Sequence, residues 1–167
     1  MIIKDFFSSI LKALYKWQFK KHVVSCGEGL HVNARCIISG EIHIGKFCNF
    51  NGIKIQGGGY LKIGDYFHSG YDCLIINGNH NYEGTKIPYD ETICKKEIII
   101  GNCVWFGSKV IVVGNVNIGD GAIVGAGSVV CHDIPPMAIV GGNPAKIIKY
   151  RNEEHYKERE TIGAFLK

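Results

Sequence analysis

The residue in this chain best suited to proton transfer is His80, the only histidine in a long polar segment, residues 77–97. An imidazole has a pKa near neutrality, so it can remove a proton from an attacking hydroxyl at neutral pH. Loops of this length in compact domains are usually functional or disordered. Taken alone, a histidine in a polar loop is also often a plain surface residue. The position makes His80 a candidate general base.

Neither the cysteines nor the histidines have the spacing of a metal site. The seven cysteines are far apart in the sequence and include no C-x-x-C pair. Reduced thiols packed inside a cytosolic protein fit this pattern better than a disulfide framework or a zinc site. We therefore expect no bound metal.

A repeat with a period of six would position these residues. Large apolar residues recur at every sixth position, and most are followed by glycine; they are Ile100, Phe106, Val112, Ile118, Val124 and Val130. A helix would place apolar residues three and four apart, and a simple strand would alternate at two. The period of six is typical of a hexapeptide β-helix, in which each hexapeptide adds a short strand and a corner and the stacked coils share one core.

The repeat predicts a single domain over residues 1–167. In its less regular N-terminal part, the interval from Ile44 to Ile63 is nineteen residues, one more than three hexapeptides, so we expect an inserted residue near the glycine run 57–59. The expected parts are, in order, a helix over 1–22, the β-helix over 23–135 with a projecting loop at 77–97, and a return segment with a short C-terminal helix over 136–167.

Residues 1–22 have the periodicity of an amphipathic helix. Its apolar residues share one face and its lysines lie largely elsewhere; the apolar residues are Ile3, Phe6, Phe7, Ile10, Leu11, Leu14 and Trp17. A basic helix of this kind either lies on an anionic membrane surface or covers the open end of the β-helix. The sequence leaves both interpretations open.

Size and charge set broad limits. The chain has 167 residues, enough for one core, and its net charge of +4 mildly favours anionic ligands or surfaces. No stretch approaches the ~20 apolar residues of a membrane span, and no signal peptide is visible. We expect a cytoplasmic protein, peripheral at the inner membrane if the N-terminal helix binds lipid. No basic stripe with interleaved aromatics indicates nucleic-acid binding.

The strict repeat and the segments after it resemble the hexapeptide acyltransferases, through the runs IGNCVWFGSKVIVVGNVNIGDGAIVGAGSVV, DIPP and GGNPAKII. The resemblance is greatest to the maltose/galactoside-type acetyltransferases and to the O-acetyltransferases of bacterial surface polysaccharide, over roughly residues 44–149. It implies an all-β fold, a left-handed parallel β-helix, a homotrimer with active sites between subunits, and acetyl-coenzyme A as donor. The general rule for parallel crossovers predicts the opposite hand, so the hand rests on the resemblance.

The resemblance also implies a catalytic role for His80. It lies seventeen residues after Ile63, the interval at which the sugar acetyltransferases place their catalytic histidine. Its imidazole would remove the proton of the acceptor hydroxyl as the oxygen attacks the thioester. Glu83 and Asp72 are candidates for its orienting partner, and a backbone carbonyl would serve equally well.

The acceptor would lie near Asn49 and Glu83. Asn49 belongs to the run CNFN, which resembles the family's A-N-F-N, whose first Asn holds the acceptor sugar. Asn49 would otherwise form a corner hydrogen bond within the coil. An acidic residue that some sugar acetyltransferases carry falls here near Gly58 and is missing, so we expect the acceptor to be held differently.

Donor binding is implied for Trp105, Ser108 and Ala126. Ser108 and Ala126 are eighteen residues apart, so in a three-sided coil they stack about 4.8 Å apart, and their backbone amides match positions where relatives bind the pantetheine arm. Trp105 resembles the family tryptophan that lines the tunnel between donor and acceptor, with surface or trimer packing as the alternative.

The adenine end of the coenzyme would be held by the segment after the last coil. Pro144 lies in the wrapping segment, and Lys146 and Lys149 are expected to contact phosphates as point charges. Relatives often carry a lysine just before DIPP, where this chain has His132. That replacement would weaken one phosphate contact.

We therefore predict an acetyltransferase that acts on a sugar hydroxyl in surface-polysaccharide (O-antigen or capsule) synthesis. A streptogramin-type acetyltransferase shares the fold and the histidine, and a non-catalytic trimeric scaffold is the alternative from another class. A γ-type carbonic anhydrase is excluded, because no two histidines have the spacing that its metal needs.

Overall fold

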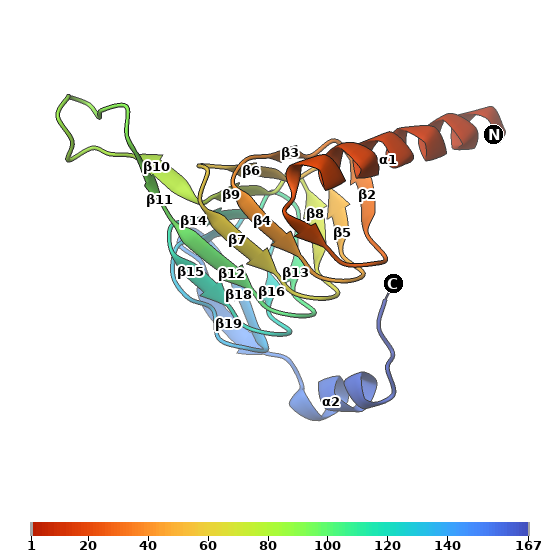
Figure 1. Cartoon of the computed structure of the whole chain (residues 1–167). Helices are drawn as coiled ribbons and strands as arrows, with labels where there is room; N and C mark the ends of the chain where they lie inside the picture. The colour runs from red at the N-terminus through yellow and green to blue at the C-terminus, as the bar shows by residue number, and fades with distance from the viewer. Residues whose placement is uncertain (1, 167) are drawn as a thin grey trace.

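The computed structural model describes residues 2–166, with side chains from residue 7 onward. The described chain winds into a left-handed parallel β-helix with three faces, which confirms the predicted fold (Figure 1). Helix α1 (Ile2–His22) crosses one end of the solenoid, and α2 (Glu153–Thr161) lies near the other end.

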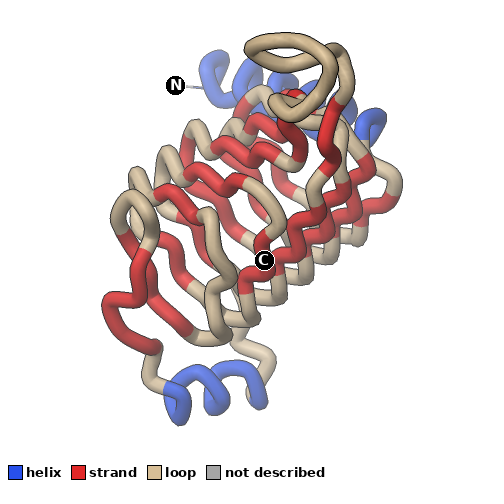
Figure 2. Tube along the Cα trace, turned by 90° about the vertical axis from the view of Figure 1, so that its left-hand side faces the viewer, coloured by secondary structure: helices blue, strands red, loops and turns tan. Residues whose placement is uncertain are grey.

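Each face of the solenoid is one sheet (Figure 2). The first face contains β1 (Ser25–Cys26), β4 (Glu41–Ile44), β7 (Tyr60–Ile63), β12 (Glu97–Ile100) and β15 (Val116–Ile118). The second contains β2 (His31–Ala34), β5 (Asn49–Asn51), β8 (His68–Tyr71), β13 (Trp105–Phe106), β16 (Ile123–Val124) and β18 (Ala138–Gly141), with β19 (Lys146–Tyr150) antiparallel at its edge. The third contains β3 (Ile37–Ile38), β6 (Lys54–Gln56), β9 (Leu74–Ile76), β14 (Ile111–Val113) and β17 (Val129–Val130).

The register follows the repeat in the sequence. Ile44 pairs with Ile63, nineteen residues later, so the coil with the extra residue is where the interval predicted it. The glycine run accommodates that insertion: Gly57 has a φ of +118°, and a Cβ on it would lie 2.2 Å from the backbone nitrogen of Gly78. Only glycine allows the base of the loop to approach this closely.

The large apolar residues of the repeat fill the interior, and four phenylalanines form a column within it. Phe19, Phe50, Phe67 and Phe106 have successive ring-centroid separations of 4.8, 5.4 and 5.0 Å. Burying each ring stabilises the fold by about 1.5–3 kcal/mol. Because Phe19 belongs to α1, this column joins the helix to the coil.

Helix α1 thus covers the open end, but not with the apolar stripe that its periodicity indicated. Phe19 is 2% exposed, and Tyr15 packs against the core. The stripe is exposed at Phe7, Ile10, Leu11, Leu14 and Trp17, while the side chains of Ile3 and Phe6 lie outside the described residues. Helix α1 contacts β2 and β3, and the side chain that it buries in the core is Phe19, near its C-terminal end, so a pattern summed over the whole helix could not identify the packing face.

Residues 77–97 project from the coil as predicted, on a short ribbon that the sequence did not indicate. Strand β10 (Gly78–His80) pairs antiparallel with β11 (Ile93–Lys95), and the loop extends away from the solenoid (Figure 1). The carboxylate of Asp90 organises the tip by accepting hydrogen bonds from Thr92 N (2.9 Å), Thr92 Oγ1 (2.5 Å) and Thr85 N (3.1 Å). These bonds, led by the Thr92 hydroxyl, hold the pKa of Asp90 below its ordinary value.

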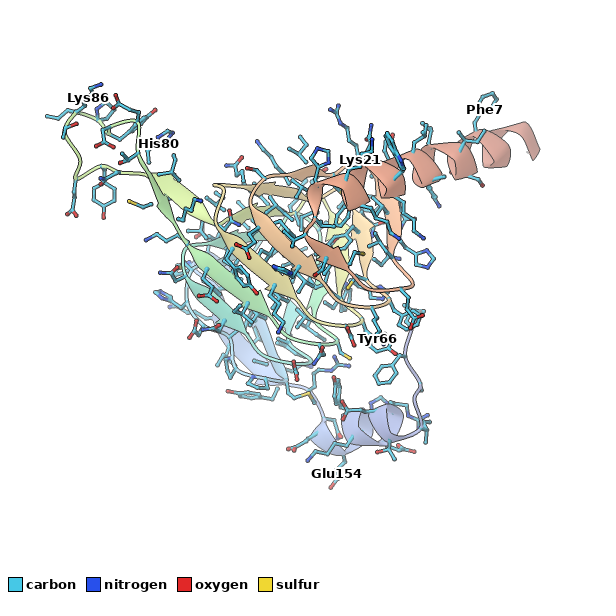
Figure 3. All side chains as sticks on the ribbon, viewed as in Figure 1. Phe7, Lys21, Tyr66, His80, Lys86 and Glu154 are labelled. Carbon is cyan, nitrogen blue, oxygen red and sulfur yellow. The ribbon has the colours of Figure 1, made fainter. Side chains whose placement is uncertain are left out.

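The return segment is a hairpin of β18 and β19 rather than a single extended stretch. The short C-terminal helix is present, and Asn152 caps it by accepting a hydrogen bond from His155 N (2.8 Å). Beyond α2 the chain returns to the coil, where Phe165 stacks on Tyr66 with ring centroids 4.3 Å apart (Figure 3).

Candidate active site

His80 ends β10 at the base of the projecting loop and is exposed (Figure 3). Its ring stacks on Tyr89, with centroids 4.1 Å apart and an interplanar angle of 18°. Pairing with Ile93 across the ribbon fixes its backbone. The imidazole is therefore presented on a structured arm, defined here as residues 77–97.

The residue that contacts the ring of His80 is neither of the two candidates for its orienting partner. Among residues 2–166, no hydrogen bond joins the imidazole to Glu83 or Asp72, and Tyr89 is the residue against the ring. The pKa of Asp90, lowered first by its Thr92 hydrogen bonds, is lowered further by its electrostatic interaction with His80. Neither Tyr89 nor Asp90 was singled out from the sequence, because only the folding of the loop brings them back to His80.

Two of the predicted site residues lie on one column of the second face. Asn49 pairs in register with His68, and His68 pairs with Trp105. Residues in register on neighbouring parallel strands point to the same side of the sheet. Asn49 and Trp105 therefore belong to one surface strip, with His68 between them.

Asn49 uses its carbonyl oxygen inside the coil. Its Oδ1 accepts hydrogen bonds from Asn33 Nδ2 (2.9 Å) and Asn51 Nδ2 (3.4 Å). The coil hydrogen bond considered from the sequence is thus present. A role in holding an acceptor would fall to its amide nitrogen.

Ser108 and Ala126 occupy successive corners, after β13 and β16, on the edge between the second and third faces. Gly127 N donates to Ser108 O at 2.9 Å, which fixes the stack that the eighteen-residue interval predicted. Within the described chain, the backbone N–H groups of Ser108 and Ala126 donate to no protein acceptor. These two N–H groups, called the amide row below, are available to a ligand.

The same edge continues into the turn between β18 and β19. Hydrogen bonds of 2.8 and 3.0 Å between this turn and Val129 hold Pro144 at the edge. Lys146 and Lys149 are exposed on β19, and His132 is exposed just after β17. Most of the predicted donor-binding residues therefore lie on the second face or on its edge with the third, whereas His132 lies on the edge between the third and first faces.

His80 and the amide row lie on different edges. The arm leaves the third face after β9 and rejoins the first face at β12, whereas the amide row lies between the second and third faces. A single chain does not bring the imidazole to the amide row.

Comparison with known proteins finds similar acetyltransferases. No family model matches the sequence. A chloramphenicol acetyltransferase of Agrobacterium fabrum is 47% identical over 116 residues, which cover 66% of this chain and 52% of the relative. The galactoside O-acetyltransferase of Escherichia coli is 34% identical over 126 residues, or 70% of this chain and 58% of the relative. Among solved structures, the chain is similar to a hexapeptide-repeat acetyltransferase of Vibrio cholerae in complex with acetyl-coenzyme A. The TM-score is 0.71 and the sequence identity 26%, and the match covers 84% of this chain and 78% of the Vibrio cholerae chain. In sequence and in fold the chain therefore matches the hexapeptide-repeat acetyltransferases.

These matches confirm the resemblance that the sequence motifs carried. This hexapeptide-repeat chain spans about half the length of the curated relatives it matches, 52% and 58%. Its described residues contain no group of three or more His, Cys, Asp or Glu that could hold a metal. None of the described helices combines the length and apolarity needed to cross a bilayer.

His68 is the site residue that sequence reasoning missed in this hexapeptide-repeat chain. The signal was available, because His68 follows Asn49 by nineteen residues, the same step that joins Ile44 to Ile63. Its atom Nε2 is buried and has no hydrogen-bond partner among the described residues. Burial lowers the pKa of His68, which favours the neutral imidazole.

Proposed function

We propose that this chain transfers an acetyl group from acetyl-coenzyme A to a hydroxyl of a sugar, with His80 as general base. The amide row carries the proposal, because unpaired N–H groups at the corners of successive coils suit the extended, amide-bearing arm of the coenzyme. Lys146 and Lys149, exposed on the same side, supply positive charge for its phosphates. The acetyl-coenzyme A complex of the Vibrio cholerae relative supports this assignment.

In the proposed reaction, His80 takes the proton of the acceptor hydroxyl as the oxygen attacks the thioester carbonyl carbon. The carbon–sulfur bond breaks, the acetyl group stays on the acceptor oxygen, and the leaving sulfur takes the proton back from the imidazolium. His80 ends the cycle neutral. The negative charge that develops on the thioester oxygen also requires a hydrogen-bond donor.

We propose a homotrimer, because the arm and the amide row lie on different edges of one solenoid. In a threefold assembly the arm of each subunit would reach the amide row and Trp105 of the next. Mixed trimers test this arrangement. When His80→Ala and Trp105→Ala chains are co-expressed in equal amounts, about a quarter of the sites should combine an intact His80 with an intact Trp105. Activity that stays at the level of the two single variants would refute a shared site.

The proposed setting is surface-polysaccharide synthesis on the cytoplasmic side of the inner membrane. The exposed apolar stripe of α1, with Lys12, Lys16 and Lys20 elsewhere on the helix, suits peripheral contact with anionic lipid. A xenobiotic acceptor is the second candidate, favoured by the 47% identity to a chloramphenicol acetyltransferase.

A thiol-release assay with acetyl-coenzyme A, a panel of sugars and chloramphenicol tests the function. It should use a Cys94→Ser background, because Cys94 is exposed and would itself react with the thiol reagent. His80→Ala should lower kcat at least about 100-fold while the fold and oligomeric state persist, and the matched control His22→Ala should leave kcat unchanged. Turnover at the wild-type level in His80→Ala refutes the assigned base. Absence of both coenzyme binding and turnover in the unmutated chain would favour a scaffold.

A further inference from the structure

A cavity of about 380 Å³ lies between the second face and the C-terminal segment, away from the amide row. Its walls include Tyr66, His68, Trp105, Arg151, Tyr156 and Phe165. Its volume is at the small end of the range for ligand sites, about 300–1,000 Å³. The cavity requires the chain after residue 150, because the coil alone supplies only one of its walls.

The C-terminal wall is held in place by specific contacts. Phe165 stacks on Tyr66 with an interplanar angle of 14°. The Arg151 guanidinium lies over the ring of Tyr156, 4.8 Å from its centroid, and Arg151 Nη1 donates to Gly121 O at 3.2 Å. The Arg151 cation is therefore already engaged. The lining also includes Arg159, which pairs with Glu158 at 2.8 Å, and Glu160, beside the aromatic rings.

His68 supplies a hydrogen-bond acceptor with no partner. Its ring is hydrogen-bonded to the backbone of Leu166, and its Nε2 is the buried atom without a partner among the described residues. The Leu166 bond therefore uses Nδ1, and in the neutral imidazole the other nitrogen carries a lone pair. A buried acceptor left unpaired costs free energy, so a ligand hydroxyl that donates to Nε2 would bind favourably.

The position of the cavity links it to the acceptor side of the site. His68 lies between Asn49 and Trp105 in the register of the second face, and Trp105 is itself 54% exposed at the cavity. A ligand in the cavity would therefore lie beside the residue that the family resemblance places between donor and acceptor.

We propose that this cavity binds the acceptor, as a hydroxylated ring with one apolar face, such as a pyranose. The apolar face lies against Trp105 and Phe165, and one hydroxyl donates a hydrogen bond to Nε2 of His68. A different hydroxyl is then directed out of the cavity, toward the arm of the neighbouring subunit. That this ligand is the acceptor of the acetyl group rests on the proposed function. That the cavity binds a sugar ring does not depend on it.

The two tryptophans of the chain make a direct test possible. A Trp17→Phe variant leaves Trp105, which lines the cavity, as the single tryptophan. It should be titrated with methyl glucopyranoside, methyl galactopyranoside and chloramphenicol, with no coenzyme present. We expect a saturable change in Trp105 emission with at least one pyranoside.

Variants in the same background locate the contact. His68→Leu should raise the Kd about fivefold or more, and His68→Gln, which keeps an acceptor atom, should restore most of the affinity. Phe165→Ala should also weaken binding, whereas Ile37→Ala, an exposed residue on the third face, should not.

The outcomes separate this proposal from the transferase assignment. Sugar binding without turnover supports the cavity and overturns only the transfer reaction. Sugar acetylation with no Trp105 response, or with equal affinity in wild type, His68→Leu and Phe165→Ala, overturns the cavity as the acceptor site. Saturable binding of chloramphenicol alone overturns the proposed ligand class.

Discussion

Replacing Phe19 by alanine should lower the free energy of unfolding by about 3–5 kcal/mol. The ring is 2% exposed and stacks on Phe50 at 4.8 Å, so it is the first member of the aromatic column. The substitution removes the transfer free energy of the ring and an aromatic contact that contributes about 0.5–1.5 kcal/mol. It also leaves a cavity that the packed coils cannot close, which accounts for the upper part of the range.

Denaturant unfolding measures this loss, at one fixed protein concentration because oligomerisation would make the midpoint depend on concentration. Phe7→Ala is the matched control, since Phe7 has the same side chain in the same helix but is 61% exposed. We expect that control to change stability by no more than about 0.5 kcal/mol. If the two variants unfold at the same denaturant concentration, α1 is not a cap and the reasoning from the aromatic column is refuted.

Three further perturbations follow from the structure. Gly57→Ala should destabilise the base of the arm, because the new methyl would lie 2.2 Å from Gly78 N and φ at this position is +118°; faster proteolytic cleavage within the arm would show it, and an unchanged cleavage rate would count against the close approach. In native protein Cys94 should react first with a thiol reagent, since it is exposed, whereas burial raises the pKa of Cys48 to about 12; mass spectrometry of the modified peptides checks the order, and early modification of Cys48 contradicts it. Burial lowers the pKa of His68 below its ordinary 6.5, so as the pH falls the unfolded chain is protonated at His68 before the folded chain is. The contribution of His68 to stability is therefore full above pH 6.5 and is lost as the pH falls through the folded-state pKa. Between these two pH values, thermal unfolding of His68→Gln should depend less on pH than unfolding of the wild type.

The C-terminal half of the coil could be predicted almost entirely from the sequence. From β12 to β17 every step is eighteen residues, so the stacking of Ser108 on Ala126 follows from counting once a three-sided coil is assumed. The last step, from Ile123 to Ile139, is sixteen residues. The same arithmetic, with one inserted residue, placed Ile63 beside Ile44. Periodic structure is predictable because each residue's neighbours are fixed by a constant interval.

Contacts made by non-repeating segments could not be predicted in this way. Tyr89 reaches His80 only because the arm folds back on the Asp90 carboxylate, and Phe165 reaches Tyr66 only because α2 turns the chain toward the coil. No interval in the sequence encodes either meeting. The missed packing face of α1 has the same origin, since one residue, Phe19, decides how the helix docks.

The placement of α1 has a consequence for the molecule as a particle. A stack of parallel coils ends in strands whose outer backbone groups have no further coil to pair with, and such an end can accept an identical chain and grow by templating. Helix α1 lies over β2 and β3 and contributes Phe19, the first ring of the aromatic column, so it occupies the place where another copy would add. The helix therefore limits the length of the solenoid and protects it from polymerising end to end into a fibre.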